Sequence, residues 1–176
     1  MAQTSALRKE PSAMDIYAEL STPGVPHKLL ARMAGTWSMK GNCRMEPGGD
    51  WIEHTGKSEQ RMVLGGRFLQ QDFNGEMMGI TFTGIGFTGY DNHTGKYVST
   101  WLDSFGTGIY HFEGTGSSDG KTITQTCSYD DPVRGPLTWR NVTKVVDANS
   151  LEFRMYTIDS SGKEDEMAVL VYTRIA

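Results

Sequence analysis

The residues best suited to chemistry in this chain are a few histidines and carboxylates on segments with strand-like alternation. Asp103 and His111 lie on either side of the turn-forming stretch SFGTG, and His54 lies on an earlier segment. A histidine beside a carboxylate can act as a general acid–base pair, and the same side chains are common metal ligands. Asp103, His111 and His54 are therefore the candidate catalytic residues. We expect neither a metal ion nor another cofactor.

The orientation of these residues depends on the pairing of the hairpin around SFGTG. A register that places Trp101 opposite His111 puts five residues on one face: Ser99, Trp101, Asp103, His111 and Glu113. The other face then carries Val98, Thr100, Leu102, Tyr110 and Phe112. Hydropathy favours the second face inside, whereas the Trp and Asp of WLDSFGTG have no obvious purpose on a surface. Both orientations stay open, and Trp101 is kept as a site candidate.

A polar row on the segment WIEHTGKSEQRMVL is the clearest sign of a cavity. Its outward set is mostly charged, which turns His54, Ser58 and Gln60 inward by the two-residue period of a strand. A packed apolar core would not select such a row, because each buried polar group without a partner costs about 1–3 kcal/mol. The row predicts an interior that holds water or the polar part of a ligand.

Inward-facing residues of the other strand-like segments complete a candidate binding site of methionines, aromatic residues and a few polar groups. We expect the lining to be Met39, Cys43, His54, Gln60, Trp101, Tyr129, Trp139, Asn141 and Met155. Methionine adapts to irregular shapes and sparse polar groups fix orientation, so this set suits a small apolar or amphiphilic molecule. The alternative is that these side chains pack on one another around ordered water.

Turn signals divide the chain after residue 35 into about ten strands. Segments such as KYVSTWLD, KTITQTCSY and LEFRMYT are rich in β-branched and aromatic residues and lie between turns such as DNHTG and SSDG. An open sheet of this size would expose two edges, whereas closure removes both. The sequence predicts an all-β, closed, antiparallel up-and-down barrel over residues 24–176. The segment PGVPHKLLARMAG predicts one short helix that caps an end, and residues 1–23 an arm that is partly mobile.

Composition narrows the class of partner. A net charge of −4 leaves no basic footprint for nucleic acid or an anionic membrane. The chain has no apolar signal region and no long apolar run, so we expect a cytoplasmic protein with a small-molecule partner. The outward Trp51 and the N-terminal arm suggest a homodimer surface.

The stretch GIGFTG, residues 84–89, matches the glycine pattern of dinucleotide-binding loops. A turn and another strand follow it instead of a helix, so no helix N-terminus is available for a phosphate. We interpret these glycines as positions where a strand bends at a barrel corner.

The order of these elements resembles a known superfamily. A short helix, then Gly35 and Trp37 entering the first strand, then a meander that ends in Tyr-Thr-Arg at Arg174, is similar to the calycins, which include lipocalins and fatty-acid-binding proteins. The resemblance implies that Trp37 closes the barrel and packs against Arg174. The stretches LGGRFLQQDFNGEMMG and GFTGYDNHTGKYVSTWLDSFGTGI more closely resemble the bacterial domain of unknown function 1579, over roughly residues 24–175. That family brings no established activity.

Three functions remain open. The first is a carrier or sensor that binds a small molecule in the barrel. The second is a cofactor-free isomerase, cyclase or hydrolase, which requires a buried bond between a histidine and a carboxylate. The third is haem binding, as in a related calycin barrel with a histidine near its last strands; because residues 150–176 contain no histidine, only His54 or His111 could serve.

Overall fold

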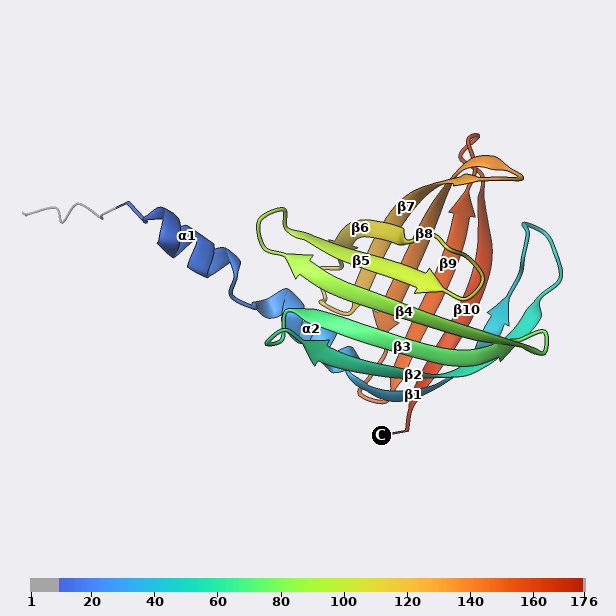
Figure 1. Ribbon diagram of the computed structural model, residues 1–176, viewed down its shortest axis with the longest axis horizontal. Coiled ribbons are helices and arrows are strands. Elements are labelled where there is room, and N and C mark those ends of the chain that lie inside the picture. The colour runs from blue at the N-terminus through green and yellow to red at the C-terminus, as the bar shows by residue number, and fades with distance from the viewer. Residues whose placement is uncertain (1–9, 176) are drawn as a thin grey trace, which may run out of the picture.

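The structure is a computed structural model, described here over residues 10–175 (Figure 1). Two helices, α1 (Ala13–Leu20) and α2 (Val25–Met33), precede ten strands. The strands are β1 (Gly35–Cys43), β2 (Ile52–Val63), β3 (Phe68–Met77), β4 (Ile80–Asp91), β5 (Lys96–Asp103), β6 (Tyr110–Gly116), β7 (Thr122–Asp131), β8 (Gly135–Val145), β9 (Ser150–Ile158) and β10 (Glu164–Arg174).

All ten strands form one closed barrel in which each strand is antiparallel to its neighbours in sequence. β1 pairs with both β2 and β10, and this closes the sheet. The predicted fold class is therefore confirmed. In Figure 1, β2 to β5 run across the view in front of the steeply inclined β7 to β10, so the barrel has two crossed walls.

Several glycines lie where the backbone of the next strand leaves no room for a Cβ atom, and Gly41 and Gly114 are two of them. A Cβ atom on Gly41 would lie 2.1 Å from the carbonyl oxygen of Val169, and one on Gly114 would lie 1.9 Å from that of Thr124. Only a residue without a side chain allows such an approach. Gly41 and Gly114 therefore permit the close contacts of β1 with β10 and of β6 with β7.

Helix α2 closes one end of the barrel, as predicted. Pro26 lies in its first turn, where a missing N–H has no consequence. Leu29, Leu30 and Met33 are buried and belong to the same apolar cluster as Trp37. Because α2 leads directly into the start of β1, the far end of the barrel is the one where β1 ends.

Helix α1 lies outside the barrel and points away from it (Figure 1). Ser12 caps it through a hydrogen bond from the Asp15 amide, yet none of its eight residues is buried. The side chain of Asn92 donates to the carbonyls of Leu20 and Thr22, both at 2.9 Å, and ties the end of this segment to the barrel. The arm expected over residues 1–23 includes residues 1–9, which lie outside the described residues.

Arg174 joins the last strand to the start of the first. Its guanidinium lies 4.1 Å from the centre of the Trp37 ring. Its N–H groups donate to the carbonyls of Ala34 at 2.7 Å, Arg32 at 3.0 Å and Ala148 at 2.7 Å. This contact between Trp37 and Arg174 lies at the end that α2 closes.

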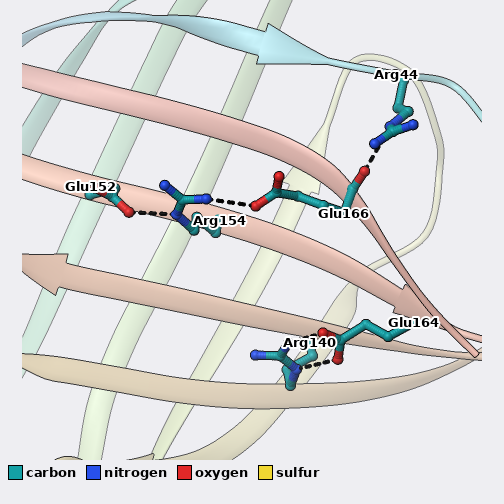
Figure 2. Close-up of polar contacts among 6 residues, drawn as sticks. All are labelled: Arg44, Arg140, Glu152, Arg154, Glu164 and Glu166. Atoms are coloured by element: carbon teal, nitrogen blue, oxygen red, sulfur yellow. Dashed lines mark hydrogen bonds and ion pairs between the residues drawn. The ribbon is translucent and has the colours of Figure 1, made fainter. Parts of the chain in front are cut away.

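Charged side chains on the outer wall of β8 to β10 pair with one another (Figure 2). Arg154 lies between Glu152, at 2.5 Å, and Glu166, at 2.8 Å, and these bonds raise its pKa further. Arg44 donates to the Glu166 carbonyl at 2.7 Å, where the register of β10 with β9 shifts. These guanidinium groups hold strands together.

Candidate functional site

The barrel encloses a cavity of about 490 Å³. Its lining extends from Met33 and Leu151, near α2, to Met45 and Phe105 at the far end. Met45 and Phe105 are exposed to solvent, so the cavity reaches the surface at the end opposite α2. A volume of this size lies within the range of about 300–1,000 Å³ that holds small organic ligands.

Most residues predicted to line a binding site do line this cavity. They are Cys43, His54, Gln60, Trp101, Tyr129, Trp139, Asn141 and Met155. Met39 is instead 1% exposed and packs in the apolar cluster with Leu30 and Trp37. The role of these residues in binding stays a prediction.

The register predicted for the hairpin of β5 and β6 is wrong by one residue. Trp101 pairs with Tyr110, and His111 pairs with Thr100. Because side chains alternate, a shift of one residue moves every β6 side chain to the other face. Trp101 and Asp103 therefore face the cavity together with Tyr110, whereas His111 is exposed on the outside. Neither of the two arrangements predicted from the sequence is correct as a whole.

Glu113 follows His111 onto the outer surface, where it pairs with Lys96. Of the candidate catalytic residues, only His54 and Asp103 share the cavity. The Asp103 carboxylate accepts hydrogen bonds from the Trp101 indole at 2.8 Å and from the Phe105 amide at 2.9 Å. Within residues 10–175 no hydrogen bond joins Asp103 to His54, so Asp103 positions Trp101 and the turn after β5.

The glycines of GIGFTG make room for this tryptophan. A Cβ atom on Gly84 would lie 2.3 Å from the Trp101 ring, and one on Gly86 would lie 2.9 Å from it. The indole therefore lies flat against β4, held by Asp103. Gly84 and Gly86 are therefore needed to make room for a side chain, and the bend that we expected at these glycines stays a prediction.

Some of the polar side chains that face inward hydrogen-bond to one another. The Ser58 hydroxyl is completely buried and accepts hydrogen bonds from the amides of Gln60, at 3.3 Å, and Gln71, at 3.1 Å. Burial raises the pKa of Tyr172 to about 12, an effect that a hydrogen bond with Gln71 reduces. This part of the row is structural, because its polar groups have partners in the protein.

Four other polar atoms have no partner within residues 10–175, and each has less than 1 Å² of accessible surface. They are His54 Nε2, Gln125 Nε2, Trp139 Nε1 and Asn141 Oδ1. All four residues line the cavity. Gln125 lies directly across from Asn141 in the pairing of β7 with β8. The predicted lining omits Gln125, although the alternation of the segment ITQTC indicates that its side chain faces inward.

The two sides of the cavity differ in their aromatic neighbours. On one side the His54 ring lies edge-on to Phe73 and Phe82, at 5.5 and 5.4 Å between centres. Burial lowers the pKa of His54, which keeps it neutral at neutral pH. On the other side Tyr110 stacks on Trp139 at 5.1 Å and 16°, and Tyr129 lies 5.5 Å from Tyr110.

These contacts test whether His54 or His111 could bind the iron of a haem group. An iron ligand must present a free nitrogen to the metal, but His111 lies outside the barrel. His54 Nε2 has less than 1 Å² of accessible surface and its ring is flanked by two phenylalanines. His111 therefore does not fit the haem hypothesis, and His54 would have to turn out from between the two phenylalanines to reach an iron.

A comparison with family models matches residues 22–174 to the protein of unknown function family DUF1579. The chain belongs to this family. This confirms the resemblance seen in the sequence. No curated protein sequence gives a significant match. Within residues 10–175, neither helix has the length and apolar character needed to cross a membrane.

Solved structures share the fold of this DUF1579 protein. Rv2717c from M. tuberculosis has a TM-score of 0.65 at 14% sequence identity, covering 88% of this chain and 100% of that one. The S-type phycobiliprotein lyase CPES from Guillardia theta has a TM-score of 0.60 at 12% identity, covering 94% of this chain and 99% of that one. At these identities the likeness concerns the fold alone.

Proposed function

We propose that this protein binds a small amphiphilic organic molecule in the barrel cavity, as a carrier or sensor. The observation that carries the proposal is the group of four buried polar atoms without partners, on residues that line one cavity. Each such atom costs about 1–3 kcal/mol when it stays unsatisfied. A ligand that hydrogen-bonds to them recovers this free energy, while the surrounding aromatic and methionine side chains contact its apolar part.

Two features favour a ligand over a cavity that serves only as packing. The polar groups of Ser58, Gln60 and Gln71 satisfy one another, so the fold can pair inward polar groups where nothing else needs them. Trp101 is held flat against the wall by Asp103 and two glycines, which keeps a large ring out of the space. The shared fold with a phycobiliprotein lyase is compatible with this proposal.

The test is native mass spectrometry of the purified protein, compared with the same sample after denaturation. We expect an excess mass that denaturation removes. His54→Leu should reduce the fraction of protein that carries this mass, whereas His111→Leu, on the outer face of the same barrel, should not. If no excess mass is found, and if lipids, small acids and aromatic compounds leave the melting temperature unchanged, the proposal is wrong.

We also infer a cytoplasmic location and a homodimer. Helix α1 exposes Met14, Ile16 and Tyr17, and the barrel exposes Trp51 to 43%. Such apolar side chains are often covered by a partner. Light scattering should give a dimer mass for the full chain and a monomer mass for Tyr17→Glu.

A further inference from the structure

We propose that the ligand is a flat, uncharged aromatic ring system that carries a carbonyl or ring-nitrogen acceptor. In this arrangement it lies beside the stacked pair Tyr110 and Trp139 and accepts hydrogen bonds from Gln125 and Trp139. This inference rests on the proposed function, since it specifies the chemistry of the molecule in the same cavity.

The shape of the ligand follows from the aromatic residues of adjacent strands. Trp101, Tyr110, Tyr129 and Trp139 come from β5, β6, β7 and β8 in turn, and all four line the cavity. Tyr110 and Trp139 are nearly parallel, and Trp101 pairs with Tyr110 in the sheet. Flat rings offer a planar ligand a large contact area with little loss of side-chain entropy. A flexible chain would gain less from such walls.

The polarity of the ligand follows from the atoms left without partners. Gln125 Nε2 and Trp139 Nε1 are both N–H donors, whereas Asn141 Oδ1 is an acceptor. The other end of the Gln125 amide is engaged, because its Oε1 accepts the Ser99 hydroxyl at 2.7 Å. This wall therefore offers mainly donors, and its complement is a ligand with at least one acceptor. Since neighbouring side chains cover these atoms, binding requires small side-chain rotations that uncover them.

The absence of charge on the ligand follows from the charged residues of the lining. The guanidinium of Arg134 pairs with Asp131 at 2.9 Å, and that of Arg44 stacks on Trp51 and donates to the Glu166 carbonyl. Both are therefore occupied. The Asp103 carboxylate lies beside Trp101 and would repel an anion. An uncharged acceptor avoids both the repulsion and the loss of hydration that an ion would suffer on entry.

The experiment compares two rings of the same size and shape, acridone, which has a carbonyl and an N–H, and anthracene, which has neither. Binding of each to the full chain is measured by fluorescence titration, with hexadecanoate as a chain-like control. We expect acridone to bind about tenfold or more tightly than anthracene, as one to two hydrogen bonds would give.

Two variants test whether the N–H donors of Trp139 and Gln125 cause this preference for acridone. Trp139→Phe keeps an aromatic ring but removes the donor and part of the ring surface. The lost surface should weaken both ligands alike, and the lost donor should weaken acridone binding by about three- to tenfold more than anthracene binding. Gln125→Leu should act in the same way. Trp51→Phe and Gln70→Leu remove the same groups from outward positions and should change neither affinity. Thermal unfolding of each variant shows that it is folded.

The outcomes separate this inference from the function on which it rests. If anthracene binds as tightly as acridone, or if hexadecanoate binds and acridone does not, the cavity binds ligands but the inference is wrong. The same conclusion holds if Trp139→Phe leaves the preference for acridone intact. If none of the three compounds binds and native mass spectrometry shows no excess mass, both the inference and the proposed function fail.

Discussion

Replacing Asn141 by leucine should make the ligand-free protein more stable. The Oδ1 atom of Asn141 is buried and unpartnered. Its neighbour across the sheet on β9 is Met155, which also lines the cavity. Leucine removes the unsatisfied amide and places apolar surface beside Met155. Because the residue borders a cavity, the larger side chain has room and no overpacking is expected.

The size of this effect can be estimated. A buried polar group without a partner costs about 1–3 kcal/mol, and we take about 1–2 kcal/mol because cavity water can supply part of a partnership. For a chain of this length, 1 kcal/mol shifts the melting temperature by about 2–4 °C. We therefore expect Asn141→Leu to raise it by about 2–8 °C, while the affinity for the ligand falls.

The assay is thermal unfolding followed by circular dichroism, on protein freed of ligand by denaturation and refolding. Asn42→Leu is the matched control, because Asn42 is exposed on the outer face of β1 and its replacement should change stability by less than about 0.5 kcal/mol. A lower melting temperature for Asn141→Leu, with Asn42→Leu unchanged, would refute the reasoning. It would mean that the Asn141 amide stabilises the fold through partners of its own.

Ser58 provides the opposite case. It is the common acceptor for the amides of Gln60 and Gln71. Ser58→Ala leaves the side-chain amides of the buried Gln60 and the half-buried Gln71 without this acceptor and should lower stability by about 1–3 kcal/mol. The same denaturation assay measures it, and an unchanged melting temperature would show that these amides do not need the hydroxyl.

Three further predictions test the wall, the closure and the buried histidine. Gly84→Ala places a Cβ atom 2.3 Å from the Trp101 ring and should destabilise the barrel by about 1–3 kcal/mol in urea titrations, whereas Gly108→Ala meets nothing within 4 Å and should not. Arg174→Lys cannot reproduce the fork of N–H groups that reaches three carbonyls, so it should lower stability by about 2 kcal/mol in the same titrations. Burial lowers the pKa of His54, so the unfolded chain binds a proton at this histidine more readily than the folded protein does. The folded state therefore loses stability as the pH falls below about 6.5, the usual pKa of histidine. His54→Leu should lose less stability than the wild type between about pH 6.5 and 5, and equal losses would contradict this.

The fold could be predicted from the sequence because its signals are local. Turn residues mark the ends of strands, and alternation identifies which residues of a strand share a face. The register between β5 and β6 is not local. Residues 104–109, which connect these strands, are long enough to allow more than one pairing, and both faces of the hairpin carry apolar and polar side chains. Alternation alone therefore could not decide whether His111 lies beside Trp101.

The candidate site shows the same limit in its chemistry. The sequence shows that His54, Ser58 and Gln60 are polar and face inward, but it does not show which of them have partners. Ser58 has them because Gln71 lies near it on β3. The role of Gly84 was equally hidden, because the residue that needs its small size is Trp101, on the next strand.

The inward-facing polar groups of the barrel therefore fall into two sets, those with hydrogen-bond partners in the protein and those without. Near α2, apolar side chains are buried, Arg174 and Trp37 close the sheet, and inward polar groups find partners in the protein. Four other buried polar atoms, on His54, Gln125, Trp139 and Asn141 along the cavity, lack them within the part of the chain that the structure describes. At about 1–3 kcal/mol each, these atoms represent a large share of the roughly 5–15 kcal/mol by which a domain is stable. A chain can maintain such an arrangement only if the closed end supplies the missing stability or a bound molecule supplies the missing partners. The second case predicts that the free energy of unfolding rises with ligand concentration. A ligand that binds only the folded state raises this free energy in proportion to the logarithm of the ligand concentration.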